Sequence, residues 1–468
     1  STAQRARAAL PSDPDAARFY SEGLIELRRS NAQAARDLFE KAVETEPDHP
    51  VIRSALAAAW AAMGYDTRAE QEARRAFEVA DTLDREHRLA VEARYREIAR
   101  EWDRAIEIYR LLWGIAPDNL EYGLRLANAQ IGASRGEEAL ATVAELHKLP
   151  EPWNRDPRIE LAEAAAAGSL SDYHRQHEAA SRAAAAGADL GARLLVAEAL
   201  LEECGAHRRL GEADPAREAC STALATFTEA GDTQGIAEAD FELGVLMWQL
   251  GDLTAARDVF EESLASYRLI GDLAGQARAL NAVAAVFQRD GELTIAKDRF
   301  ETALAIGREI DDRVTIGKVL NNLANIGKEL GELEEARALY EESLAIKRES
   351  GNRSGVAYTL HNLGEVLLVL ARPAEARERQ QEAMEIFADL GERFGITATR
   401  ISLGLVDRAN GEIAAAEQSF TRAVSEARTA DNPYLTAHSL FGLGDIAIAR
   451  GELDEAERLH SEALALRT

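Results

Sequence analysis

Asparagine and basic residues gather between residues 278 and 362 of the chain. An asparagine amide carries donors and an acceptor, so it can pair with both the N–H and the C=O of an extended peptide. Cations in the same stretch favour a peptide of acidic or amide-rich character. The alternative is that the asparagines cap or bridge neighbouring helices. We expect a peptide-binding surface formed by Arg278, Asn281, Lys318, Asn321, Asn322, Asn325, Lys328, Tyr358, His361 and Asn362.

Other residue types that carry chemistry form no convincing constellation. His174 and His177 stand three apart on a predicted helix and could in principle share a metal ion. They lack nearby cysteine ligands and a His-Glu-x-x-His arrangement, so we interpret them as solvent-facing. We therefore predict no catalytic residue, no metal ligand and no cofactor, and we do not expect this chain to be an enzyme.

The only two cysteines, Cys204 and Cys220, fall on the two helices of one predicted hairpin. A disulfide is geometrically conceivable there. Free cysteine also packs well as a small apolar residue, and we favour two buried thiols.

The charge of the chain limits its partners. Its 468 residues include 54 Lys and Arg against 81 Asp and Glu, a formal net charge of -27. Such a charge repels nucleic acid and anionic membranes, and no apolar run approaches the roughly 20 residues that a membrane-spanning helix needs. The chain begins at Ser1 without a methionine, so we expect it to be an excised piece of a longer polypeptide.

The second half of the chain repeats every 40 residues. A glycine column marks a helix-to-helix turn, because glycine adopts the left-handed conformation that ends a helix. A second column, of Asp and Asn, stands where the next helix begins and can cap its free N–H groups. The turn column holds Gly211, Gly251, Gly291, Gly331, Gly411 and Gly451, with Ala371 as the exception, and the cap column holds Asp232, Asp272, Asp312, Asn352, Glu392 and Asn432.

Within each unit, a large and a small residue in the first helix (helix A) oppose an alanine and an aromatic in the second (helix B). Two helices approach closely only where side chains are short, and the ring fills the groove beside that contact. Examples are Leu243-Gly244 with Ala256 and Phe260, and Leu403-Gly404 with Ala416 and Phe420.

These columns resemble the tetratricopeptide repeat. The resemblance implies an all-α solenoid of helical hairpins, a right-handed superhelix of about eleven to twelve repeats. The 40-residue unit, with Asn-Asn-Leu-Ala at 321–324, is similar to a longer-helix subclass. Gln380 and His460 depart from the aromatic column, and Glu22 and Glu203 stand where leucine is expected.

The repeat length divides the chain into four parts. We expect an N-terminal lead-in at 1–16, 34-residue units at 17–149, a loop and degenerate helix pair at 150–190, and seven 40-residue units at 191–468.

In such a solenoid, helix A residues not used for packing line a concave surface. The resemblance implies that helix A asparagines hold extended peptides. Asn325 and Asn362 match the amide half of the carboxylate clamp of co-chaperone relatives, but Asn321 stands where that clamp has its first lysine.

The run from Leu10 to Ala16 is similar to the start of repeat arrays attached to bacterial serine/threonine kinases. This leaves two functions open: a protein-binding scaffold, or a regulatory or sensor module of a larger bacterial signalling protein such as a kinase or transcription regulator. We expect a cytoplasmic location, or an extracytoplasmic one if the chain is the sensor of a membrane-anchored kinase. At the C-terminal end, Leu459, Ala463, Leu464 and Leu466 predict an apolar strip and a homodimer formed through it.

Overall fold

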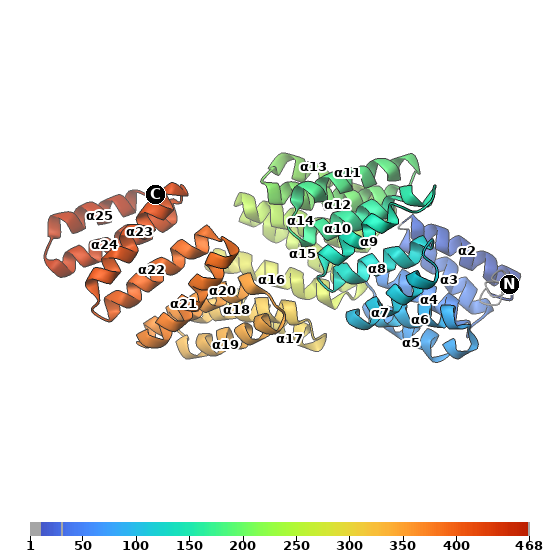
Figure 1. The fold of residues 1–468 in the computed structure, drawn as a ribbon, viewed down its shortest axis with the longest axis horizontal. Coiled ribbons are helices and arrows are strands. Elements are labelled where there is room, and N and C mark those ends of the chain that lie inside the picture. The colour runs from blue at the N-terminus through green and yellow to red at the C-terminus, as the bar shows by residue number, and fades with distance from the viewer. Residues whose placement is uncertain (1–10, 30, 467–468) are drawn as a thin grey trace. The chain divides into compact units, whose positions relative to one another are not determined.

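The computed structural model describes residues 11–29 and 31–466. These residues form 24 α-helices and two short 3₁₀ helices, with no strand (Figure 1). Short turns join most consecutive helices, and a longer connection that contains η2 joins α9 to α10; the helices pair into helical hairpins as the repeat pattern predicts. The all-α solenoid class and the number of repeats are confirmed.

The chain divides into two compact units, Ser1–Ala279 (unit 1) and Leu280–Thr468 (unit 2). The boundary falls within helix α16 (Leu273–Arg289).

Unit 1 contains seven consecutive hairpins in the part that the structure describes. Residues 1–10 of the predicted lead-in lie outside the described residues, Leu10 of the kinase-like run among them, and the first described helix begins at Pro14 with its N-terminus capped by Asp13. The elements are α2 (Pro14–Arg28), α3 (Ala32–Thr45), α4 (Pro50–Ala62), α5 (Asp66–Glu78), η1 (Ala80–Thr82), α6 (Arg85–Ile98), α7 (Trp102–Ile115), α8 (Leu120–Gly132), α9 (Gly136–Leu146), η2 (Trp153–Arg155), α10 (Pro157–Ser169), α11 (Tyr173–Asp189), α12 (Arg193–Leu210), α13 (Ala213–Ala230), α14 (Thr233–Leu250) and α15 (Leu253–Ile270).

Unit 2 continues the same alternation of helix A and helix B. Its helices after α16 are α17 (Leu293–Glu309), α18 (Arg313–Leu330), α19 (Leu333–Glu349), α20 (Arg353–Val369), α21 (Pro373–Leu390), α22 (Arg393–Ala409), α23 (Ile413–Thr429), α24 (Pro433–Arg450) and α25 (Leu453–Ala465). The predicted change of repeat length near residue 190 remains a prediction.

The turn and cap columns act as the sequence indicates. Gly251 ends α14 with φ of 83°, in the left-handed region. Ala371, the non-glycine member of the turn column, also adopts the left-handed region, with φ of 58°. The Asp232 and Asp312 side chains accept hydrogen bonds from N–H groups of the helices that they precede. Glu392 occupies the same column, but its side chain makes no cap hydrogen bond.

Close approach at the small-residue column is also confirmed. A Cβ atom added to Gly244 would lie 2.6 Å from the ring of Phe260, which is itself buried. Where the aromatic is replaced by Gln380, the side chain is fully buried, and its Nε2 donates to the backbone oxygen of His361 at 2.8 Å. This hydrogen bond compensates for burying a polar group in an aromatic position.

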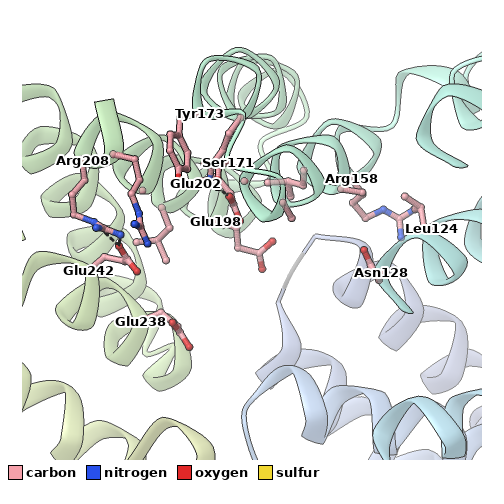
Figure 2. A pocket seen from close by; sticks show the side chains of 18 of the residues that line it. Leu124, Asn128, Arg158, Ser171, Tyr173, Glu198, Glu202, Arg208, Glu238 and Glu242 are labelled. Carbon is pink, nitrogen blue, oxygen red and sulfur yellow. Dashed lines mark hydrogen bonds and ion pairs between the residues drawn. The ribbon is translucent and has the colours of Figure 1, made fainter. Parts of the chain in front are cut away.

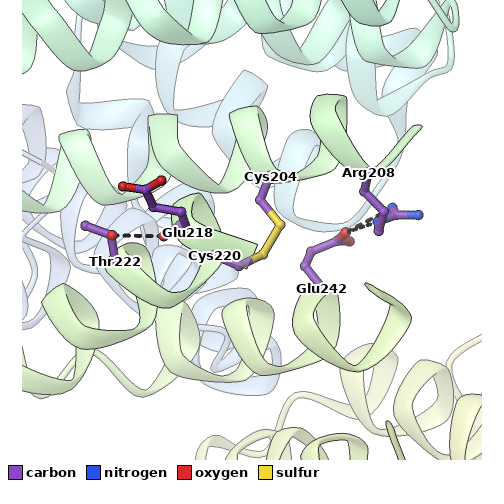
Figure 3. The surroundings of a disulfide bond; sticks show 6 residues. All are labelled: Cys204, Arg208, Glu218, Cys220, Thr222 and Glu242. Atoms are coloured by element: carbon purple, nitrogen blue, oxygen red, sulfur yellow. Dashed lines mark hydrogen bonds and ion pairs between the residues drawn. A yellow bond between two sulfur atoms is a disulfide. The ribbon is translucent and has the colours of Figure 1, made fainter. Parts of the chain in front are cut away.

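The preference for buried thiols at the two cysteines was wrong. Cys204 on α12 and Cys220 on α13 form a disulfide, with their Cα atoms 5.4 Å apart (Figure 3). The small-residue column of helix A faces the aromatic column of helix B. Two cysteines in these columns therefore lie within disulfide range.

The predicted C-terminal apolar strip is narrower than expected. Leu459 and Ala463 are buried against α24, so only Leu464 and Leu466 of the four are exposed. The amphipathic helix turns the first two toward its own hairpin partner. Among the described residues, no helix is long and apolar enough to cross a membrane.

Candidate functional site

The predicted asparagines of unit 2 are hydrogen-bonded between successive A helices. Asn322 Nδ2 on α18 donates to Asn281 Oδ1 on α16 at 3.0 Å. Asn362 Nδ2 on α20 donates to Asn325 Oδ1 on α18 at 3.3 Å. We call these four residues the amide ladder. The bridging interpretation is therefore realised in the structure, and any peptide must use the capacity that the ladder leaves.

That remaining capacity is considerable. Each amide group has two N–H donors and two acceptor lone pairs. A ladder bond consumes one donor of Asn322 and one acceptor site of Asn281, and both side chains are half-buried. Asn325 is the most heavily used, since its Oδ1 also accepts from the Tyr340 hydroxyl at 2.5 Å.

Asn321 belongs to a separate chain of hydrogen bonds that ends on a buried lysine. Lys347 Nζ on α19 donates to Thr359 Oγ1 at 2.8 Å, and Thr359 Oγ1 donates to Asn321 Oδ1 at 3.0 Å. Lys347 is only 7% exposed, and no carboxylate pairs with it in the described part of the chain. Burial, together with the nearby charge of Lys318, lowers the pKa of Lys347 to about 8.

The predicted cations of unit 2 differ in how far they are neutralised. Lys328 Nζ lies 2.9 Å from Glu365 Oε2 in an ion pair. His361 contacts the same glutamate at 3.5 Å and Gln380 at 3.1 Å, and burial lowers its pKa. Lys318 is exposed and has no ion pair with any described residue. Positive charge therefore stays available at Lys318.

The two remaining predicted residues are not members of the amide ladder. Tyr358 is 38% exposed and packs edge-on against Phe387, with ring centroids 4.9 Å apart. Arg278 belongs to unit 1, where its guanidinium is bound to Glu238 at 2.6 Å and lies over the Phe241 ring. Unit 2 thus brings together the asparagines, Lys318, Lys328 and His361.

A second candidate surface lies in unit 1, and none of the predicted site residues lines it. A cavity of about 920 Å³ is formed mainly by helices α8, α10, α12 and α14 (Figure 2). The A helices of four consecutive hairpins therefore supply most of its wall. Its polar lining is Glu121, Arg125, Asn128, Arg158, Ser171, Tyr173, Gln176, Glu198, Glu202, Arg208, Arg209, Glu238 and Glu242.

The charges of this cavity are largely paired inside the unit. Arg158 lies 3.0 Å from Glu121 and 2.9 Å from Asp156, and Arg208 lies 3.0 Å from Glu242. Burial raises the pKa of Glu202, whose Oε2 accepts a hydrogen bond from Gln176 at 2.7 Å. A ligand entering here would have to compete with existing pairs.

The sequence does carry a signal for this cavity. Glu198 and Glu238 occupy one column of the 40-residue repeat, and Glu202 and Glu242 occupy another. A search for polar residues repeating in packing-free columns would have found all four.

Comparisons with known proteins agree with the fold. The family model described as tetratricopeptide repeat matches residues 275–349, 315–389, 355–428 and 395–468. Among solved structures, the apo form of RapI is similar, with 18% identity, a TM-score of 0.56, and coverage of 74% of this chain and 97% of that one. Aspartyl phosphate phosphatase F from Bacillus subtilis gives 13% identity, a TM-score of 0.50, and coverage of 75% and 94%. No curated protein matches the chain.

Proposed function

We propose that the chain, whose residues 275–468 match the tetratricopeptide-repeat family model, is a non-enzymatic scaffold for protein interaction. Its ligand is an extended peptide of acidic or amide-rich character. The peptide lies on the A helices of unit 2, along the amide ladder, and contacts Asn321, Lys318, Lys328, Tyr358 and His361.

The observation that carries this proposal is uncompensated positive charge beside free amide capacity. Lys318 has no ion pair among the described residues, and the buried ammonium of Lys347 has only a hydroxyl partner. Burying a cation without a carboxylate costs stability. A peptide carboxylate near Lys318 would reduce that cost, which gives the site a reason to prefer an acidic ligand.

The ladder also supports recognition of the peptide backbone. Helix A asparagines on successive hairpins present donors and acceptors in a row, as an extended chain requires. Asn281 and Asn322 hold each other in place, so less side-chain entropy is lost when a peptide binds. Arg278 is outside this arrangement, because it is already paired with Glu238.

The context that we propose is a larger bacterial signalling protein, supported by the kinase-like run Leu10–Ala16. The disulfide favours the extracytoplasmic alternative over the cytoplasm, since structural disulfides persist in oxidising compartments. Trapping free thiols in intact cells before lysis would test this location. If Cys204 and Cys220 are alkylated in the native cell, the result would support the cytoplasmic location instead.

The binding proposal is tested by fluorescence polarisation with a labelled peptide of alternating Glu and Asn. Its control is a matched peptide of alternating Lys and Ser. We expect saturable binding of the acidic peptide alone, weakened by the Lys318→Ala and Asn322→Ala double substitution. Equal binding of both peptides, or no effect of the substitutions, would contradict the proposal.

A further inference from the structure

Two histidines and a glutamate meet between helices α11 and α12 of unit 1. Glu203 and His207 stand four residues apart on α12 and therefore share one helix face. His177 comes from α11, and its ring centroid lies 4.4 Å from that of His207. One ligand atom from each of the three residues lies within 4.8 Å of the other two.

Glu203 is out of place in its repeat. The column that it occupies holds leucine or valine in the 40-residue units that follow, from Leu243 to Leu443. Glu203 has no ion pair or hydrogen bond within the described chain, although it is half-buried. Neither packing nor an ion pair accounts for a carboxylate here.

The His207 imidazole is held as metal-binding imidazoles are, and the His177 ring has an unpartnered nitrogen. His207 Nδ1 lies 2.5 Å from a carboxylate oxygen of Glu212, which orients the ring and leaves Nε2 as its ligand atom. His177 Nδ1 is shielded from solvent and has no hydrogen-bond partner in the described structure. A metal ion bound through Nδ1 would give that atom the partner that it lacks.

A second cluster in unit 1, formed by His147, Glu160 and Glu163, has a similar composition, but its carboxylates are already paired with arginines. His147 lies 3.6 Å from Glu163 and 3.9 Å from Glu160. Those carboxylates are already held by arginines, Glu163 by Arg175 at 2.7 Å and both by Arg182. Arginine thus supplies the positive charge at the second cluster, whereas no side chain supplies it at Glu203.

We propose that His177, Glu203 and His207 bind one divalent transition-metal ion of the zinc class. Two imidazoles and a carboxylate are a donor set that Zn²⁺ accepts, with a fourth position open to water or to a side chain of a partner. Ligand atoms bonded at about 2.0 to 2.2 Å in a tetrahedron lie closer together than 4.8 Å, so the three side chains close slightly around the ion. The ion joins α11 to α12, next to the disulfide that joins α12 to α13.

This assignment differs from the sequence prediction of no metal ligand. The sequence paired His177 with His174, three residues earlier on the same helix. The structure leaves His174 exposed and places His177 against His207, thirty residues later. His174 therefore serves as a matched control.

The test is titration of the oxidised full chain with ZnCl₂ in an isothermal calorimeter, supported by Co²⁺ absorption spectra. Keeping Cys204 and Cys220 in their disulfide prevents thiolates from binding the metal. We expect one tight site per chain and a tetrahedral Co²⁺ spectrum. His207→Ala and Glu203→Gln should each weaken Zn²⁺ at least tenfold, and Glu212→Gln should weaken it by about tenfold or more.

The control variants His174→Ala and His147→Ala should bind within twofold of the unsubstituted chain. Circular dichroism checks that each variant is folded, and Glu203→Gln, which preserves side-chain size, covers the case in which a histidine variant unfolds. The proposal is overturned if no ion binds with the expected stoichiometry, or if Glu203→Gln and His174→Ala behave alike.

Discussion

The two units use the same repeat columns for opposite chemistry. The column of Glu198 and Glu238 changes sign at Arg278, at the end of unit 1, and continues as Lys318 in unit 2. The column of Glu202 and Glu242 continues in unit 2 as Ala282, Asn322 and Asn362. The packing columns hold small and aromatic residues in both units, as with Gly244 against Phe260 and Gly404 against Phe420. In this architecture the side chains not needed for packing are free to set the chemistry of each surface.

The candidate surfaces of the two units also differ in the partners that their polar side chains have. In unit 1, glutamates form ion pairs with arginines, as in the Arg208–Glu242 and Arg278–Glu238 pairs. In unit 2, asparagines are met by asparagines, and Lys318 is left without a counter-ion in the described chain. Charged pairs already formed resist a ligand, whereas amides with spare capacity accept one.

Asp240 in unit 1 and Lys347 in unit 2 are buried ionisable groups with no ion pair among the described residues, and they predict opposite effects of pH. Asp240 in unit 1 is 5% exposed, and burial, reinforced by Glu262, raises its pKa to about 7. Between about pH 4 and 7 the unfolded chain has lost the proton that the folded chain keeps, so stability falls as pH rises. Asp240→Asn should therefore stabilise unit 1 above pH 7 by up to about 4 kcal/mol.

Denaturant unfolding at pH 4 and pH 8 measures this effect. The variant and the unsubstituted chain should differ little at pH 4 and most at pH 8. An equal difference at the two values would show that Asp240 does not titrate in this range.

The disulfide is confined to unit 1, because both cysteines lie there. Closing a loop with a sequence separation of 16 restricts the unfolded chain, which is worth about 3 kcal/mol. The Cys204→Ala and Cys220→Ala double variant should therefore lower the stability of unit 1 by about that amount. Added reductant should bring the unsubstituted chain to the same denaturation midpoint, and two reactive thiols in the unreduced, denatured protein would refute the bond.

In unit 2 the buried charge is Lys347, whose pKa is lowered to about 8. Between about pH 8 and 10.5 the unfolded lysine keeps a proton that the folded one has lost, so stability rises across this window. Below pH 8 the buried charge costs up to about 3 kcal/mol, which Lys347→Met should recover. Unfolding midpoints that rise alike from pH 8 to 10 in both proteins would assign the dependence to other groups.

The sequence could predict the turns, the caps and the close helix contacts that recur in the repeat. The left-handed turn at Gly251, the cap at Asp232 and the contact between Gly244 and Phe260 each follow from local geometry that the columns display. The disulfide and the meeting of His177 with His207 could not be settled in this way. They occur once each, and they depend on the rotamers of two side chains facing each other across neighbouring helices.

The cavity of unit 1 could be predicted from the sequence only in part. Its glutamates recur at 40-residue spacing, but Arg158 and Tyr173 come from the stretch predicted as a loop and degenerate helix pair. In that stretch the repeat columns are too weak to assign a face to each residue. The asparagines of unit 2 were predicted to form one surface, whereas their hydrogen bonds to each other depend on side-chain torsions that a column does not specify.

Exchanging side chains between the two units at matched repeat columns tests which unit binds the peptide. Lys318→Glu with Asn322→Glu gives unit 2 the residues that unit 1 has at Glu238 and Glu242. If unit 2 binds the acidic peptide, these changes introduce charge repulsion and remove the hydrogen bonds of the Asn322 amide, and they should weaken binding by about 1 to 3 kcal/mol.

The reciprocal control, Glu238→Ala with Glu242→Ala, removes carboxylates from unit 1 only and should leave the affinity within twofold. Because both changes lie on half-buried or exposed helix A positions, circular dichroism should remain unchanged. If the Glu238→Ala and Glu242→Ala control loses affinity and the Lys318→Glu and Asn322→Glu variant does not, the peptide binds in the cavity of unit 1 and not on unit 2.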